Sequence, residues 1–534
     1  MMQFDETFDV VVVGFGHAGA VSAINAADAA ARTLIIEKSE VPGGLSICSY
    51  GAVRSARDPD AAFAYLKTTN DGRTPDAVLR VLADGMCTLE AYVRELAQIN
   101  GAVVTTSIED NARSATRDDP NRRRLSGNYP FPGTGTFYHT TVVDVPGFEA
   151  RTAYPWANGA PNGPKLFNVV HDNVVKRGVE VRLTTPALRL IADPATREVR
   201  GVRVGNNGAE RNIKARRGVV LACGGFEGNA EMKAQFLEGK PVLNAAARTN
   251  TGDGIRMAQD LGAALWHMWH IHGAYGFRHV DPDYPYAVRL KRFPDWFPGE
   301  SHKARLKMAW ILLDQNGRRF MSEYQPYTQD TAVRPLQYFD PVTQRFPRNP
   351  AFMICDEEGR RMYPLGKATS NDRGIRYYWS DDNLKEVGLG ILQRADTLEG
   401  LAIALGLEPE AVVASVTRWN EMCAAANDDE FGRPGGTMTP IRTPPYYGAP
   451  VWATLSNTQG GPVHDARCRI IDVYGNPIPR LYAAGELGSA FGHLYLSGGN
   501  IAECFVTGRI AGRNAASLGP WDVLSPAVSG KTPT

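Results

Sequence analysis

A tyrosine, a serine, two glycines and an asparagine stand close together near the end of this chain. They lie in GHLYLSGGN (492–500), directly before a segment, IAECFVTGRIAG, that reads as a helix. Glycines at a helix start let the backbone come close to an anion or to the polar edge of a ring. Tyr495 and Ser497 would add a phenol and a hydroxyl to such a site, although Ser497 could equally cap the helix.

A second candidate site lies near the other end, where residues 14–19 read GFGHAG between an apolar run and an Ala-rich segment. In a strand–turn–helix unit, Gly14 permits the tight turn, Gly16 lets the backbone approach a pyrophosphate, and Gly19 lets the helix pack on the sheet. Glu37 ends the next apolar run, where a carboxylate would bind ribose hydroxyls. A glycine-rich turn alone is weak evidence, but these features together predict a dinucleotide site.

The elements that must position these residues follow from hydrophobic periodicity. The predicted strands are 9–14, 33–38, 177–204 (a meander with a turn at 193–196), 217–225 and 480–486, and a helical stretch covers 397–426. Residues 269–443 are rich in Trp, Tyr, His and Pro and show few clean periods. This order predicts a nucleotide-binding α/β domain with a large insertion.

Composition excludes several classes of protein. The 534 residues suffice for two or more domains, and 43% hydrophobic with 22% charged residues is ordinary for a globular protein. A net charge of +1 favours neither nucleic acid nor a membrane surface, and no apolar run reaches the length of a membrane span. The seven cysteines are scattered without a CxxC pair, which argues against a zinc site or a disulfide framework. The N-terminal segment lacks the basic region of a signal peptide. We therefore expect a cytoplasmic protein.

Three further segments indicate which dinucleotide is bound, since no second fingerprint for NAD(P) is present. VPGGLSICSYG (41–51) is a Gly/Ser-rich loop that could line a pyrophosphate and a flavin. VVLACGGF (219–226) resembles the "ATGG" strand of FAD proteins, with Cys223 in place of Thr. LYAAGE (481–486) resembles the strand that precedes the flavin-contacting helix in such proteins.

Together with TGDG (251–254) and NGRRFMSE (316–323), these segments resemble the fumarate reductase and 3-ketosteroid dehydrogenase flavoprotein superfamily. The resemblance implies an α/β fold (α+β overall), with a Rossmann-like FAD-binding domain in two parts, 1–268 and 444–534. A substrate-capping domain, 269–443, is inserted between them. It also implies a redox reaction at a carbon–carbon bond. Members can bind FAD covalently through a histidine near the segment that corresponds to GGLSICSYG; this segment has none, so we expect non-covalent FAD.

The residues expected to contact FAD are Gly14, Gly16, His17, Ala18, Gly19, Glu37, Lys38, Gly43, Gly44, Ser46, Ser49, Gly51, Ala187, Gly224, Asp253, Glu486, Gly498, Asn500 and Ile501.

The fumarate branch of the superfamily needs cations to hold two carboxylates. In that branch a histidine precedes the TxGG turn and an arginine precedes the final GGN. Here Asn457 stands at the first position, and YLSGGN contains no arginine. A dicarboxylate would lack charge-assisted hydrogen bonds worth roughly 1.5–3 kcal/mol each. The sequence therefore argues against succinate or fumarate as substrate.

The ketosteroid dehydrogenase branch fits better. In it, a C-terminal tyrosine and the N–H of a glycine four residues on polarise the substrate carbonyl, and Tyr495 and Gly499 have that spacing. A second tyrosine acts as base after a segment like SEYQPY (322–327), which gives Tyr327 this role. Tyr129 or Tyr138 could assist it, although aromatic packing is the more ordinary role for each.

The resemblance thus predicts an FAD-dependent dehydrogenase that forms a C=C bond next to a ketone in an apolar, cyclic or steroid-like substrate, with an unidentified electron acceptor. The alternatives are a flavin-dependent reductase of an α,β-unsaturated acid or enone, and a non-catalytic flavin-binding protein. His270 and His272 could face one side of a strand and bind a metal. Since no carboxylate or cysteine is spaced to join them, we expect a pocket wall or ordinary packing, and no metal.

The first prediction concerns how FAD is held. Acid or heat denaturation should release FAD into solution, because residues 43–51 contain no histidine for a covalent bond. The measurement is flavin absorbance in the supernatant and in the precipitated protein. Flavin that stays with the denatured chain would contradict non-covalent binding, and recovery of NAD(H) would contradict FAD.

Overall fold

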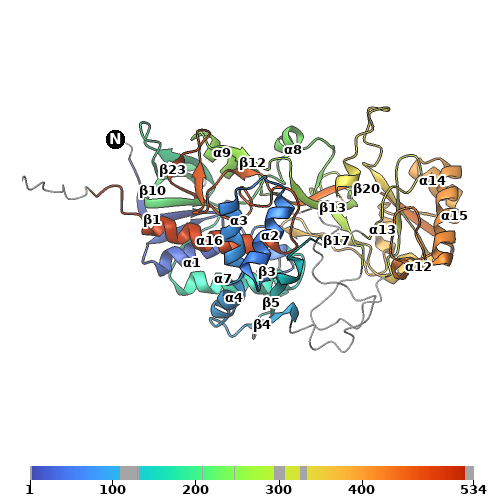
Figure 1. Cartoon of the computed structure of the whole chain (residues 1–534), viewed down its shortest axis with the longest axis horizontal. Helices are drawn as coiled ribbons and strands as arrows, with labels where there is room; N and C mark the ends of the chain where they lie inside the picture. Colours follow the sequence, from blue (N-terminus) through green and yellow to red (C-terminus); the bar gives the residue numbers. More distant parts are fainter. Residues whose placement is uncertain are drawn as a thin grey trace, which may run out of the picture.

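The computed structural model describes residues 3–108, 129, 131–206, 208–245, 247–293, 307–324 and 333–523. Two large sheets dominate it, one around β1 and β10 and the other around β13 and β20 (Figure 1). A helical layer with α1 and α16 covers the first sheet, and α14 and α15 lie at the far end of the second (Figure 1).

The first sheet has eight described strands in the order β22-β23-β10-β1-β2-β7, with β8 and β9 attached through β10. Strands β23, β10, β1, β2 and β7 run parallel, whereas β22, β9 and β8 pair antiparallel. Their bounds are β1 Glu6–Val13, β2 Thr33–Ile36, β7 Glu180–Arg182, β8 Ala187–Ala192, β9 Val199–Asn206, β10 Ala209–Leu221, β22 Arg469–Ile471 and β23 Pro477–Ala483.

Both faces of this sheet are buried, which explains the continuous apolar runs of its strands. In β1, Val10 and Val12 join the core beneath the α1–α16 layer, whereas Val11 and Val13 join the core on the opposite face. Successive side chains of a strand point to opposite faces, so one run of valines supplies both cores.

Helices α1 (His17–Asp28) and α16 (Gly499–Ser517) pack with their backbones close together. A Cβ on Gly508 would lie 2.9 Å from the Ala18 carbonyl oxygen, and one on Gly512 would lie 2.2 Å from that of Ser22. Because these two glycines of α16 carry no side chain, the first and the last of the described helices come into direct contact.

The second sheet also has eight described strands, ordered β15-β16-β20-β13-β14-β17, with β11 and β19 paired to β20. Their bounds are β11 Leu243–Asn244, β13 Ile271–Phe277, β14 Val288–Leu290, β15 Ile311–Leu313, β16 Ala351–Asp356, β17 Gly366–Ala368, β19 Gln393–Ala395 and β20 Tyr446–Thr458. Since β11 and β20 lie outside 269–443, the second sheet extends beyond the predicted insertion. The domain boundaries themselves stay a prediction.

The other described strands form three smaller sheets. One sheet contains β3 Ala52–Ala56, β4 Val103–Thr106 and β5 Phe137–Asp144. The second pairs β6 Ala157–Asn158 with β18 Ser370–Asn371, and the third pairs β12 Leu265–Trp266 with β21 Gly461–Pro462. The remaining helices are α2 Pro59–Asn70, α3 Asp76–Met86, α4 Leu89–Ala97, α6 Ala150–Ala153, α7 Asn162–Lys176, α8 Ala230–Phe236, α9 Asp253–Gln259, α11 Val333–Leu336, α12 Glu357–Met362, α13 Leu384–Gly388, α14 Leu398–Leu405 and α15 Pro409–Ala425.

The predicted helical stretch 397–426 forms two helices instead of one. Gly406 adopts φ +70° and ends α14, and Pro409 is the first residue of α15. Glycine favours a left-handed helix end, and proline favours the first position of a helix because it has no N–H to donate.

A buried ionic cluster in the second half of the molecule explains the NGRRFMSE motif. Arg319 lies 3.0 Å from Glu323 and 3.0 Å from Asp428, and Arg433 lies 3.2 Å from Glu323. All four side chains are almost fully buried. The motif therefore fixes the chain just before residue 325.

All seven cysteines are free thiols. In the part of the chain that the structure describes, no helix combines the length and apolar character that a membrane crossing needs. The cytoplasmic location stays a prediction.

Candidate active site

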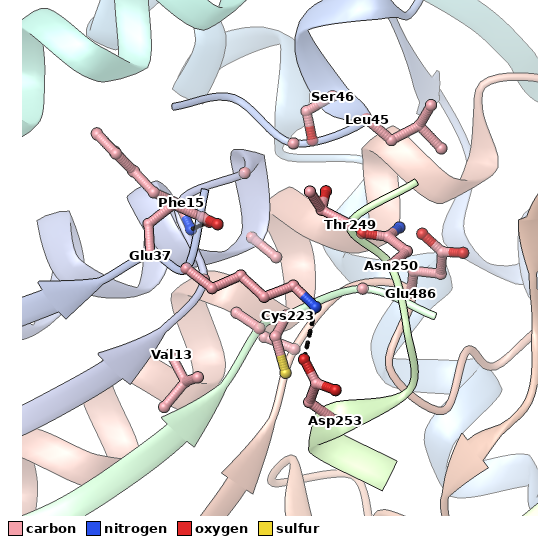
Figure 2. A pocket seen from close by; sticks show the side chains of 18 of the residues that line it. Val13, Phe15, Glu37, Leu45, Ser46, Cys223, Thr249, Asn250, Asp253 and Glu486 are labelled. Carbon is pink, nitrogen blue, oxygen red and sulfur yellow. Dashed lines mark hydrogen bonds and ion pairs between the residues drawn. The ribbon is translucent and has the colours of Figure 1, made fainter. Parts of the chain in front are cut away.

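A first cavity opens at the carboxyl ends of the parallel strands. It is lined by residues that follow β1, β2, β10 and β23, and Figure 2 shows Phe15 and Glu37 on one side, with Asn250 and Glu486 on the other. Ligands of open α/β sheets bind in this crevice beyond the strand ends.

The glycine turn after β1 lets the backbone line this cavity. Gly14 has φ +105°, and a Cβ there would lie 2.5 Å from the Ala222 carbonyl oxygen. Glu37 accepts hydrogen bonds from the Phe15 N–H (2.9 Å) and from the Ser39 N–H (2.8 Å). Its carboxylate thus holds the turn in place while also lining the cavity.

An ion pair lies at another edge of the first cavity, marked by the dashed line in Figure 2. Lys38 Nζ lies 2.6 Å from Asp253 Oδ2 and donates to Thr251 Oγ1 at 2.6 Å. This pair joins the end of β2 to the start of α9, two segments more than 200 residues apart in sequence.

His17 is buried at the start of α1, and both of its ring nitrogens lack a hydrogen-bond partner. Burial lowers the pKa of this histidine to about 3, so its ring is neutral. Its backbone N–H donates to Ser46 Oγ (3.0 Å), and its ring lies between Phe167 and Phe505. A buried imidazole without a protein partner suits a polar ligand atom.

A second cavity, of about 370 Å³, continues from the first. The two share Leu45, Ser46, Glu486 and Cys504 as lining residues. Its walls come from the loop at 45–52, from β5, from strands β13 and β14 of the second sheet, and from the loop before α16. It therefore lies between the second sheet and the segments around β3, β5 and the start of α16.

Glu486, at the junction of the cavities, is buried beside a second carboxyl group, that of Glu227. Burial raises its pKa well above the ordinary value, and the neighbouring Glu227 carboxyl raises the pKa further. Its Oε1 accepts a hydrogen bond from the Thr458 N–H (3.0 Å). We conclude that the carboxyl pair holds a proton at neutral pH, since two buried carboxylates in contact resist joint ionisation.

Tyr495 lines the second cavity and is held on three sides. Its ring stacks on His272, with 4.0 Å between centroids, and meets Phe491 edge-on at 5.4 Å. The Asn500 N–H donates to its hydroxyl oxygen (3.2 Å). Burial raises the pKa of this phenol, so it stays protonated over the physiological range.

The residues just before α16 reach the same cavity through their backbone. Arg54, fully buried on β3, donates from Nε to the Ser497 carbonyl oxygen (2.5 Å), and its N–H donates to the Gly498 carbonyl oxygen (3.3 Å). The N-cap residue is Gly498, and no side chain caps the helix. The capping role considered for Ser497 is therefore wrong, and this residue lines the cavity instead.

The role predicted for the Gly499 N–H in binding the substrate carbonyl stays a prediction. This amide donates to the Leu496 carbonyl oxygen at 2.7 Å, and a Cβ on Gly499 would meet the Phe491 ring at 2.5 Å. Gly499 does not line the second cavity. It closes the turn beneath Tyr495 and packs against Phe491, because only glycine leaves room for that ring.

Most of the other predicted residues line a cavity. The first is lined by Gly14, Gly16, His17, Ala18, Glu37, Lys38, Gly44, Ser46, Ala187, Gly224, Asp253 and Glu486. The second is lined by Ser46, Ser49, Glu486, Tyr495, Ser497, Gly498, Asn500 and Ile501. Gly19, Gly43 and Gly51 line neither cavity; a Cβ on each would meet Gly14, Ile47 and Asn162, respectively. Tyr327 lies outside the described residues.

Tyr129 and Tyr138, considered as helpers of the base, are both buried, and Tyr129 belongs to the core under the α1–α16 layer. The Tyr138 hydroxyl donates to Glu90 Oε2 (2.8 Å), and Tyr129 packs beside Phe131. Neither lines the second cavity. Both therefore fit the packing role.

The histidine-rich segment also contributes one wall of the second cavity. His272 Nδ1 lies 3.2 Å from Asn457 Oδ1, whereas His270 Nδ1 lies 2.7 Å from the Phe491 carbonyl oxygen. These two histidines thus serve different neighbours. Among the described residues, no group of His, Cys, Asp and Glu is placed to hold a metal ion.

The sequence interpretation missed four cations in the second cavity, Arg289, Lys291, Arg292 and Lys367. The basic run RLKR (289–292) was the available signal. Alternation along a strand places its residues on two faces, but only the fold shows that these residues line the same cavity as Tyr495.

Comparison with known proteins places this geometry in a family. The model of the FAD binding domain family matches residues 9–501. The chain therefore belongs to the FAD binding domain family. Digoxin reductase of Eggerthella lenta is 27% identical over 96% of this chain and 88% of that protein. A 3-oxosteroid 1-dehydrogenase of Mycobacterium tuberculosis is 28% identical over 96% of this chain and 98% of that protein.

The fold agrees with these relatives. A 3-ketosteroid delta1-dehydrogenase structure from Sterolibacterium denitrificans matches with a TM-score of 0.75 at 24% identity, over 96% of this chain and 99% of that chain. The predicted fold class, the resemblance and the FAD cofactor are thereby confirmed.

The residues of this FAD binding domain fit the cofactor physically. The glycine turn would bring backbone N–H groups and the α1 N-terminus to the pyrophosphate. Glu37 lies where ribose hydroxyls would reach it, and the buried His17 ring offers an unsatisfied polar edge. Because His17, His139 and His272 reach the cavities from other segments, non-covalent attachment stays a prediction.

The second prediction concerns this turn. Gly14→Ala should purify with little FAD, because the new Cβ would meet the Ala222 carbonyl at 2.5 Å and shift the turn. Gly72→Ala is the matched control, since Gly72 also has positive φ (+72°) but no atom within 4 Å of its Cβ position. The measurement is the ratio of flavin to protein absorbance. Equal FAD content in both variants would contradict the assignment of this turn.

Proposed function

We propose that this FAD-dependent oxidoreductase acting on CH–CH groups introduces a C=C bond next to a ketone in a ring-shaped substrate. The observation that supports it most directly is Tyr495. A protonated phenol lies in a cavity that continues into the cofactor cavity, with a backbone N–H on its oxygen. The relative named 3-oxosteroid 1-dehydrogenase supports the same chemistry.

Tyr495 would hold the substrate carbonyl. Its O–H donates to the carbonyl oxygen, and the bond strengthens as negative charge develops on that oxygen. The Asn500 N–H on the phenol oxygen polarises the O–H and makes it a better donor. The stacked His272 ring and the edge of Phe491 fix the direction of the phenol. Ser497, which lines the same wall, could add a second hydroxyl donor.

The oxidation removes two hydrogens from neighbouring carbons. A base takes the proton α to the carbonyl, and the electron pair of that C–H bond forms the C=C bond as hydride leaves the β carbon. Bound FAD supplies the two-electron hydride acceptor. The substrate is thus oxidised by two electrons, and its proton remains on the protein.

Tyr327 remains our candidate for the base. Tyr324, in the same SEYQPY segment, packs against Phe293 (5.8 Å between centroids) and lies beneath the Arg292 guanidinium (5.3 Å). Phe293 and Arg292 both line the second cavity. The buried ionic cluster holds Glu323 in place, four residues before Tyr327 in the sequence, which supports the assignment.

The reverse reaction, reduction of an enone, would use the same groups because both directions pass through one transition state. One relative is named digoxin reductase, and this name supports reduction as the alternative direction. Which direction operates depends on the electron partner of the flavin.

The third prediction concerns the substrate. Cyclic 3-ketones should bleach the FAD under anaerobic conditions, because their carbonyl can bind Tyr495. Succinate should not, because it has no ketone carbonyl for Tyr495 to bind. Rapid oxidation of succinate would contradict the proposal.

The fourth prediction concerns the tyrosines. Tyr495→Phe should slow single-turnover flavin reduction by on the order of 10²–10³, the usual effect of losing one such donor. Tyr327→Phe should slow it at least as much, and the double variant should show less than the summed effect. FAD content should stay normal in both.

The control for these variants is Tyr482→Phe, which changes a buried tyrosine that lines neither cavity. Near-normal reduction by Tyr495→Phe would remove the carbonyl donor from the proposal. Near-normal reduction by Tyr327→Phe would remove the base and point to another tyrosine of the same segment, Tyr324.

A further inference from the structure

The Asn457 side chain connects two groups of the second cavity, His272 and Glu486. In the antiparallel pair of β13 and β20, Asn457 stands directly opposite His272. Directly opposed side chains lie on one face of a sheet and interact across the strands. Asn457 Oδ1 lies 3.2 Å from His272 Nδ1, and all three residues line the cavity.

The other end of the Asn457 amide meets the carboxyl group of Glu486. Burial and the Glu227 carboxyl raise the pKa of Glu486, and a hydrogen bond with the Asn457 side chain acts in the opposite direction. Such a bond lowers the pKa of a carboxyl group because an N–H donor stabilises its charged form. The Asn457 amide therefore donates from Nδ2 to Glu486 and offers Oδ1 as an acceptor to His272.

This orientation of the amide fixes the tautomer of the His272 ring. An amide oxygen can only accept a hydrogen bond, so the His272 Nδ1 atom must carry the proton in this contact. In a neutral imidazole the other ring nitrogen, Nε2, is then the acceptor. Turning the ring over would break the bond to Asn457.

The His272 ring supports the phenol that is proposed to hold the substrate carbonyl. The rings of His272 and Tyr495 stack with 4.0 Å between centroids and 30° between planes, and His272 is only 6% exposed. Turning the imidazole would move the phenol. A second proton on the imidazole would place a positive charge against the phenol ring, which attracts cations. Tyr495 thus depends on both the position and the charge of His272.

We propose that Asn457 is a positioning residue for Tyr495: it holds His272 as the Nδ1–H tautomer and so fixes the phenol that binds the ketone. The inference rests on the proposed function, because Asn457 acts through the carbonyl donor of that reaction. Its bond to Glu486 also ties the phenol to the junction with the cofactor cavity.

The first measurement reads the tautomer directly by ¹⁵N NMR of FAD-loaded protein labelled in its histidines, with His272→Gln to identify the signal. Wild type should show a protonated Nδ1 on His272. Asn457→Leu removes the acceptor and should abolish this preference. Asn457→Asp has the same shape and adds a negative charge, so His272 should take up a second proton at a higher pH than in wild type. Both variants leave unchanged the other charged or titratable groups near the ring, which include Glu486, His139, Arg289, Lys291, Arg292 and Lys367.

The second measurement separates action through Tyr495 from a general structural role. Asn457→Leu should slow single-turnover flavin reduction by a cyclic 3-ketone by about tenfold or more, because misplacing a reacting group is costly. In a Tyr495→Phe background the same change should have little further effect, since residues that act through one contact are not additive.

The matched control is Asn420→Leu. Asn420 is a half-buried asparagine that bonds to the backbone of Ile441 and lines neither cavity. This change should alter neither the His272 tautomer nor the rate of flavin reduction.

The inference is overturned if His272 carries its proton on Nε2 in wild type, or if its tautomer is the same in Asn457→Leu. It is also overturned if Asn457→Leu slows reduction equally with and without the Tyr495 phenol, or leaves the rate unchanged. If the tautomer behaves as expected but no cyclic ketone reduces the flavin, the contact between Asn457 and His272 stands and the dehydrogenase proposal fails.

Discussion

The contact between α1 and α16 is the constraint on which the site depends. Gly508 and Gly512 of α16 lie against the backbone of Ala18 and Ser22 in α1, so the two helices approach more closely than larger residues would allow. Helix α1 begins at the glycine turn of the cofactor cavity, and α16 begins directly after Tyr495 and Ser497. Their contact brings two sequence segments nearly 480 residues apart to one place.

Around that junction, buried groups that favour their neutral form lie in one place and cations lie in another. Burial and the neighbouring Glu227 carboxyl raise the pKa of Glu486, and burial lowers the pKa of His17 to about 3, so both groups favour their neutral forms. Cations of β14 and β17, Arg289 and Lys367 among them, line the second cavity together with the Tyr495 phenol.

Local patterns predicted the first half of this arrangement well. The valine run of β1, the spacing of Gly14, Gly16 and Gly19, and the acidic end of β2 are set by short-range geometry, so the sequence alone identified them. Spacing could not show that the Gly499 amide closes a turn onto Leu496. Arg289 and Lys367 were missed, because their meeting depends on the pairing of two strands that are far apart in sequence.

The most direct test of the account is a crystal structure of the FAD-loaded protein with a bound, unreactive cyclic ketone. The account predicts that the ketone oxygen lies within hydrogen-bond distance of Tyr495 Oη, at about 2.6–2.8 Å. The ring should extend from there towards β14. A ketone oxygen directed away from Tyr495, with the phenol still packed between His272 and Phe491, would contradict the claim that this tyrosine polarises the substrate.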